Sequence, residues 1–152
     1  MRDAKRLPAR LSTAERLRYA GAVIDEYAFE DTAPDTSPIY DVARIERIVR
    51  AAAREGRSLS YSELLLTLGF RFTRPKMRAV CQTLAEVDAR AARAGEPELA
   101  VLVVREGDGL PGQGWWTGRT DYAGQWTGAE AAAFIRKVQG RAFRYWQART
   151  AD

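Results

Sequence analysis

The sequence contains no histidine and a single cysteine, Cys81. The missing histidine excludes serine–histidine triads, histidine general bases and mixed cysteine–histidine zinc sites. A lone cysteine forms no internal disulfide, which favours a reducing compartment, and its place on an apolar helix stripe favours a core role. The acidic residues show no paired spacing that indicates catalysis or metal binding. We therefore expect a protein that is not an enzyme and holds no metal or other cofactor.

Long apolar runs are also missing. No stretch approaches the ~20 apolar residues that cross a bilayer, and the first ten residues lack the apolar centre of a signal peptide. We expect a cytoplasmic protein without a membrane partner. The length of 152 residues predicts one compact domain, and the net charge of +4 is compatible with nucleic-acid binding.

Apolar residues at helical spacing, bounded by capping residues and glycines, predict a mostly helical chain. One predicted helix runs from about 13 to 29 and follows a capping box of Ser12 and Glu15. Three further helices are expected from Asp41 to Gly56, from Ser60 to Gly69 and from Thr73 to Gly95. A last helix is expected to start at a capping box of Thr127 and Glu130 and to end at about Ala148. We expect an arm, helix and linker over residues 1–37, followed by the main domain over 38–152.

The apolar run Leu99–Val104 predicts a strand, with a second strand expected around Trp115–Arg119. The two predicted helices before this run are joined by a very short connection at Gly69–Thr73. Such a connection is typical of a helix-turn-helix. A helix-turn-helix followed by a strand and a glycine-rich turn is the plan of a winged helix. The predicted fold is therefore α+β, mostly helical and winged-helix-like, with flanking N- and C-terminal helices.

A basic stretch opens the predicted helix over 74–94. It contains no acidic residue, and its cations are Arg71, Arg74, Lys76 and Arg78. At a helix N-terminus such side chains suit DNA phosphates, although the same pattern also fits a solvated helix start. A second group lies on the C-terminal helix and extends the same surface if it faces the same side: Arg136, Lys137, Arg141, Arg144 and Arg149.

The glycine-rich loop from Glu106 to Trp116 leaves several interpretations open. Pro111 and the glycines fit a tight corner that folds Trp115 and Trp116 over the core. As a wing, the loop would instead contact the minor groove, or stack its rings on single-stranded bases. A phosphate loop is disfavoured because the segment has no Walker lysine.

Three stretches in chain order resemble the alkylguanine DNA alkyltransferases and the alkyltransferase-like proteins. "LSYSELLLTLG" resembles their "SYGELA..LG" segment, and "MRAV" resembles their "ARAV". "ELAVLVVREGDGLPGQGW" resembles the stretch in which Pro-Cys-His-Arg precedes two valines and a glycine turn. The similarity covers roughly residues 42–116. It implies a winged-helix domain that binds DNA.

By this resemblance, Tyr61 corresponds to the tyrosine that helps to open the duplex, and Arg78 to the arginine inserted into the base stack. Ala100 stands where the alkyltransferases carry their acceptor cysteine. Alkyl transfer as that family performs it is therefore excluded. Recognition of a modified base without transfer stays open, and it requires a pocket between Tyr61, Arg78 and Ala100.

The same region also resembles an uncharacterised bacterial domain that occurs alone or fused to nuclease modules. That domain has "ISYGELA" followed by "LTxLVVxKxTGxPGxGF". The residues in step with the second pattern are Leu102, Val103, Val104, Gly109, Pro111, Gly112 and Gly114. This resemblance implies no particular activity.

The sequence favours a non-catalytic DNA-binding protein. Its predicted contacts are Arg71, Arg74, Lys76, Arg78, Tyr61, Trp115 and Trp116. The main alternative is a protein-interaction module of a bacterial defence or repair system, anchored by the tryptophan loop or the terminal helix. The lesser alternative is the modified-base recognition described above.

Overall fold

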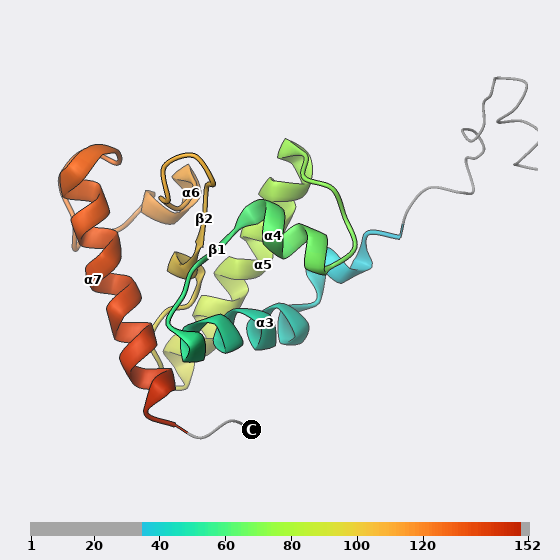
Figure 1. The fold of residues 1–152 in the computed structure, drawn as a ribbon, viewed down its shortest axis with the longest axis horizontal. Helices are drawn as coiled ribbons and strands as arrows, with labels where there is room; N and C mark the ends of the chain where they lie inside the picture. The colour runs from blue at the N-terminus through green and yellow to red at the C-terminus, as the bar shows by residue number, and fades with distance from the viewer. Residues whose placement is uncertain (1–34, 150–152) are drawn as a thin grey trace, which may run out of the picture. The chain divides into compact units, whose positions relative to one another are not determined.

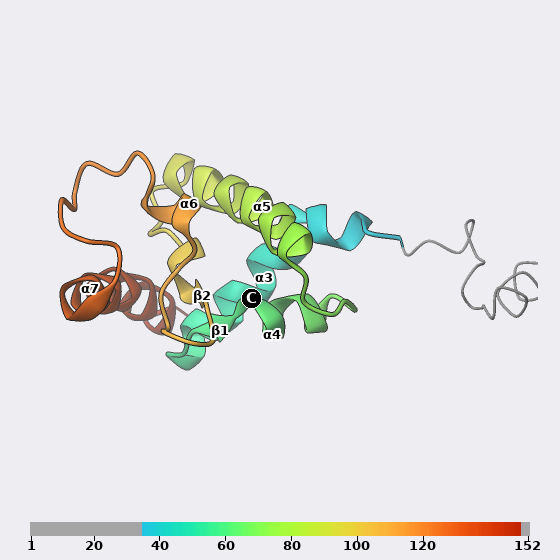
Figure 2. The same cartoon turned by 90° about the horizontal axis from the view of Figure 1, so that it is seen from above.

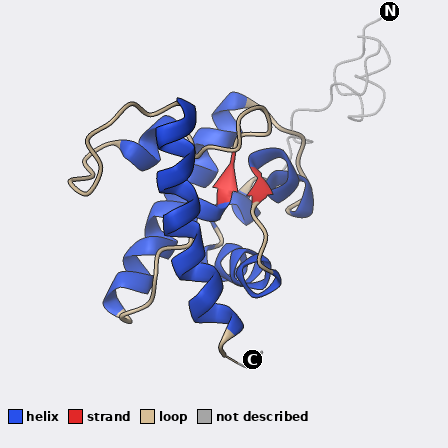
Figure 3. Ribbon diagram, turned by 60° about the vertical axis from the view of Figure 1, so that its left-hand side comes forward, coloured by secondary structure: helices blue, strands red, loops and turns tan. Residues whose placement is uncertain are grey.

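The computed structural model describes residues 35–149, and a compact unit begins at Ser37. The arm, the helix predicted over 13–29 and most of the linker lie outside the described residues. Helices and two very short strands form the described part (Figures 1 and 3). The elements are η2 (Ser37–Tyr40), α3 (Val42–Glu55), β1 (Leu59–Ser60), α4 (Tyr61–Thr67), α5 (Arg74–Arg93), η3 (Ala100–Leu102), β2 (Val103–Val104), α6 (Gln113–Trp116) and α7 (Gly128–Gln147).

Helix α3 forms where the capping signals predict it. The Asp41 side chain accepts a hydrogen bond from the Arg44 amide, and Gly56 ends the helix at a φ of 72°, which favours glycine. The apolar face of α3 packs against α5 and α7. Its buried residues are Ile45, Val49, Ala52 and Ala53.

Helices α4 and α5 also confirm their predicted boundaries. Ser60 and Glu63 form the capping box of α4, and the Thr73 side chain accepts from the Lys76 amide at the start of α5. A short connection joins the two helices, as Figure 2 shows from above. The predicted mostly helical α+β class is confirmed by this arrangement and by the small sheet.

The strand predicted over Leu99–Val104 is largely wrong. Ala100–Leu102 forms a 3₁₀ turn, and only Val103–Val104 is a strand. The Asp88 carboxylate explains the difference, because its Oδ1 accepts from the Leu99 and Ala100 amides at 2.7 and 2.9 Å and bends the chain there.

The partner of this strand also differs from the prediction. β2 pairs in parallel with β1, so that Leu59 lies opposite Val103 and Ser60 opposite Val104. The strand expected around Trp115–Arg119 is wrong, since Gln113–Trp116 forms the short helix α6. The turn between β2 and α6 is stabilised by two backbone hydrogen bonds, in which the Arg105 amide donates to Leu110 O and the Gly109 amide donates to Arg105 O.

Helix α7 begins after Thr127, as predicted, but the Thr127 side chain makes no capping hydrogen bond. Ile135, Val138 and Trp146 are buried, because apolar residues at helical spacing share one face of the helix. The helix packs against α3 and η3, so it closes the core on that side (Figure 1).

Candidate functional site

Four cations gather around the start of α5. Arg71 and Arg74 are exposed, as is Arg78 one turn further on, and Lys76 is half-buried. We call these four residues the α5 basic surface. The exposure follows from the sequence pattern, because the apolar positions of α5 occupy its other face.

Within residues 35–149, the α5 basic surface has no carboxylate partner, as is also true of Arg47 and of the exposed cations of α7. Arg57, Arg93 and Arg105 each form an ion pair, with N···O distances of 2.7, 3.2 and 2.9 Å. The Lys76 ammonium instead lies 5.8 Å from the centre of the Phe70 ring. The N-terminus of a helix carries a partial positive charge, which is unfavourable beside unpaired cations. An anion bound there is therefore stabilised both by the cations and by the helix N-terminus.

The structure brings a further arginine to this region. The Arg44 guanidinium donates a 3.3 Å hydrogen bond to the Thr67 carbonyl at the end of α4. No sequence signal indicates this contact, since 23 residues separate its partners. Two apolar side chains are also exposed here: Leu66, near the end of α4, is 70% exposed, and Phe72, within the α4–α5 connection, is 44% exposed.

The cations of α7 lie apart from the α5 basic surface. Figures 1 and 2 both place α7 on the opposite side of the unit from the connection between α4 and α5. Arg136, Lys137, Arg141 and Arg144 are exposed there, and Arg149 stacks on the Tyr145 ring at 3.4 Å. The condition for one basic surface across both helices, that the two groups face the same side, is therefore not met.

Tyr61, one of the residues predicted to contact DNA, faces inward. Its side chain is 4% exposed, and its hydroxyl accepts a 2.8 Å hydrogen bond from the Gly112 amide. Burial raises the pKa of Tyr61, which keeps the phenol neutral. Gly112 suits this close approach, because a Cβ there would lie 3.0 Å from Met77 Cε and 3.3 Å from the phenol oxygen, and these side chains would have to shift slightly.

The tryptophans follow the corner interpretation of the loop. Trp116 is 3% exposed and packs against Tyr122 and Phe134. Its ring therefore has no face available for a base, which corrects its predicted role in stacking. Trp115 is half-buried, with the Arg119 guanidinium 3.9 Å from its ring centre.

A cavity of about 430 Å³ lies between α5, the segment that leads into η3, and α6. Its apolar wall includes Leu84, Ala85, Ala100 and Trp115. The remaining lining residues are Tyr61, Cys81, Gln82, Asp88, Glu98, Gly114 and Arg119. The pocket required for modified-base recognition is thus present in part: Tyr61 and Ala100 line it, but Arg78 does not.

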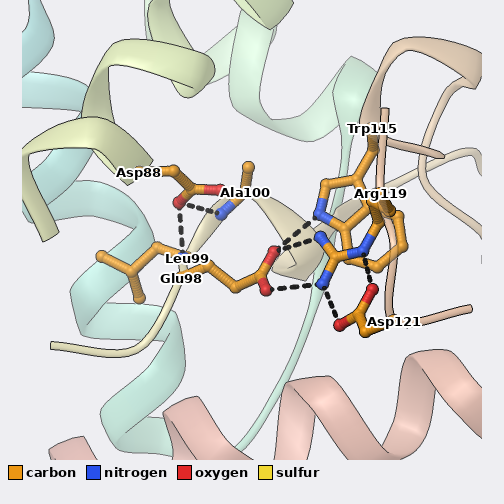
Figure 4. Close-up of polar contacts among 7 residues, drawn as sticks. All are labelled: Asp88, Glu98, Leu99, Ala100, Trp115, Arg119 and Asp121. Atoms are coloured by element: carbon orange, nitrogen blue, oxygen red, sulfur yellow. Dashed lines mark hydrogen bonds and ion pairs between the residues drawn. The ribbon is translucent and has the colours of Figure 1, made fainter. Parts of the chain in front are cut away.

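One wall of the cavity is a closely connected polar group (Figure 4). Arg119 donates to both Glu98 oxygens at 2.9 Å and to both Asp121 oxygens at 3.0 and 2.9 Å. The Trp115 indole nitrogen donates to the same Glu98 at 3.0 Å. This network connects three segments of the chain and fixes the position of the Trp115 ring.

Asp88 stands at another part of the wall. Its Oδ1 accepts two backbone amides, whereas its Oδ2 has no hydrogen-bond partner in the described part of the chain. Desolvation raises the pKa of Asp88 to about 6, although the two amide hydrogen bonds oppose the shift. Sequence spacing gave no sign of this site, because its members are distant along the chain.

Comparison with known proteins assigns no family or function to the chain. No family model, curated protein or solved structure matches the chain. Over residues 35–149, no group of three or more cysteine and acidic side chains is placed to hold a metal ion. Within the same range, no helix is both long and apolar enough to cross a membrane.

Proposed function

We propose that the protein is a non-catalytic, cytoplasmic DNA-binding protein that contacts the phosphate backbone through the α5 basic surface. The observation that carries the proposal is a set of four cations, three exposed and one half-buried, that have no carboxylate partner in the described chain and lie at the positive end of α5. Phosphates supply the missing negative charge, and Arg and Lys contacts to them dominate DNA affinity. Arg44 adds a cation from α3 beside the end of α4.

The arrangement of α4 and α5 supports this proposal. They are consecutive helices joined by a short connection, as in a helix-turn-helix, where the second helix approaches the major groove. In a winged-helix-like docking, α5 is presented to the duplex and Arg78 points toward the groove. The resemblance to the alkyltransferase-like proteins favours the same surface. Tyr61 and Trp116 then support the fold behind the surface and do not touch DNA.

The first test compares DNA affinity between two matched double variants. Arg74→Ala/Arg78→Ala is expected to weaken binding to a labelled duplex by roughly tenfold or more at low salt, because it removes two phosphate contacts. Arg136→Ala/Arg141→Ala removes the same charge from exposed positions of α7 and is expected to have a much smaller effect. Fluorescence anisotropy with duplex and single-stranded DNA measures both. Equal losses in the two variants would contradict a site on α5.

A second candidate function is protein binding at the same connection. Its support is the exposure of Leu66 and Phe72, because apolar side chains next to arginines are typical of protein interfaces. Leu66→Ala/Phe72→Ala distinguishes the two functions. A purified partner that loses affinity for this variant, but not for Arg74→Ala/Arg78→Ala, would favour the protein interface. DNA binding that depends on the arginines would favour the first function.

A further inference from the structure

The cavity beside η3 has the size and composition of a small-ligand site. Its volume of about 430 Å³ lies in the range of such sites, and most of its wall is apolar. Polar groups enter it at defined positions, from α5 through Asp88 and from the segments around Glu98 and Arg119. The site is independent of the α5 basic surface, since none of the four cations lines it.

The charges of the wall decide which ligands the cavity suits. Arg119 is its only cation among the lining residues, and two carboxylates already surround that guanidinium. Glu98 has both oxygens engaged by Arg119 and one also by Trp115. Asp88 keeps one oxygen without a hydrogen bond and forms no ion pair within the described chain, although Arg119 acts on it at longer range. A ligand that brings positive charge to Asp88 completes the site, whereas an anion meets two carboxylates.

We propose that this cavity binds a small organic cation, with a flat apolar body against Trp115 and Ala100 and an amidinium or ammonium group at Asp88 Oδ2. The amidinium suits the site because it offers paired N–H donors to a carboxylate. The indole ring adds an aromatic surface for the body of the ligand. Phosphate-bearing ligands do not fit the charge of the wall.

The proposal includes a pH dependence. Asp88 faces Glu98 and Arg119, and the cavity also contains Tyr61 and Cys81. Burial raises the pKa of both the Tyr61 phenol and the Cys81 thiol, so these two groups remain neutral near pH 7. With the pKa of Asp88 at about 6, its ionised fraction rises roughly tenfold between about pH 5 and pH 7.5. Affinity for a cation is expected to rise by a similar factor.

Benzamidine, benzamide and benzoate test the charge, because they share one body and differ in the head group. Two-dimensional NMR of the full chain gives the affinity, with the Trp115 indole N–H and the Ala100 amide as local reporters. At about pH 7.5, benzamidine is expected to bind saturably and at least about fivefold tighter than benzamide, with no binding of benzoate. Equal affinity for benzamide, tighter binding of benzoate, or no saturable shift at the two reporters would overturn the proposal.

Three variants locate the binding site. Asp88→Asn keeps an oxygen for the Leu99 and Ala100 amides, and it is expected to weaken benzamidine binding at least about fivefold and abolish its pH dependence. Ala85→Phe fills the cavity from an exposed position of α5 and is expected to block binding. Glu86→Gln removes an exposed carboxylate of the same helix outside the cavity and is expected to leave affinity unchanged. Unchanged affinity in Asp88→Asn would overturn the assignment.

Discussion

Replacing Arg119 by methionine is expected to lower the free energy of unfolding by about 3 kcal/mol. The Arg119 and Glu98 side chains are only 17% and 26% exposed, so the variant leaves Glu98 with the indole of Trp115 as its remaining partner in the described chain. Removing one member of a poorly solvated ion pair costs more than the pair itself contributes, because the other charge stays desolvated. The midpoint of urea unfolding measures the loss, provided that the slope with denaturant is unchanged.

A more exposed pair provides the matched control for Arg119. Arg105 also donates two hydrogen bonds to one carboxylate, that of Asp108, but these side chains are 36% and 44% exposed. Arg105→Met is therefore expected to cost less than about 1 kcal/mol. Arg119→Lys keeps the charge but not the planar set of donors, so its free energy of unfolding should remain well below that of the wild type. Equal losses for Arg119→Met and Arg105→Met would contradict a structural role for the network.

The second large effect concerns Asp88 and pH. Its pKa is about 6 in the folded protein against an ordinary value of 3.8, so the native state holds this proton more tightly than the unfolded state does. The contribution of Asp88 to stability is therefore most favourable below about pH 4 and falls as the pH rises to about 6. The difference corresponds to roughly 2 to 3 kcal/mol.

Asp88→Asn removes this titration and leaves the shape of the side chain nearly unchanged. As the pH rises from about 4 to about 7, the free energy of unfolding of the variant is expected to increase by about 2 to 3 kcal/mol relative to that of the wild type. Unfolding curves of both proteins across that range measure the gain, and other titrating groups largely cancel in the comparison. A constant difference, or one of the opposite sign, would show that the folded pKa of Asp88 is not raised. A carboxylate kept at a cost to stability is typical of a functional position.

Local signals predict the described helices well. Asp41 and Gly56 bound α3, Ser60 starts α4 and Thr73 starts α5, because side-chain caps and left-handed glycines act within a few residues. The strands expected over Leu99–Val104 and around Trp115–Arg119 had no such local signals, and the structure has a 3₁₀ turn and a short helix in these segments. An apolar run such as Leu99–Val104 fits several buried structures, and a side chain 11 residues away in the sequence decides the outcome.

The two candidate sites differ in the same way, because one depends on local sequence signals and the other on contacts between distant segments. The exposure of Arg74 and Arg78 follows from helix periodicity, because both residues lie off the apolar face of α5. The cavity depends instead on contacts between distant segments, such as Arg119 with Glu98 at a separation of 21 residues. Periodicity carries no information on such contacts, and for that reason Asp88 and Arg119 were missed.

The salt dependence of DNA affinity tests the proposed function most directly. If the four cations of the α5 basic surface each neutralise a phosphate, the logarithm of the binding constant should fall against the logarithm of salt with a slope near −4, about −0.9 for each phosphate. Anisotropy titrations from about 50 to about 200 mM salt give this slope, and Arg74→Ala/Arg78→Ala should bring it near −2. A wild-type slope near zero, or equal slopes in both proteins, would contradict phosphate binding at the start of α5.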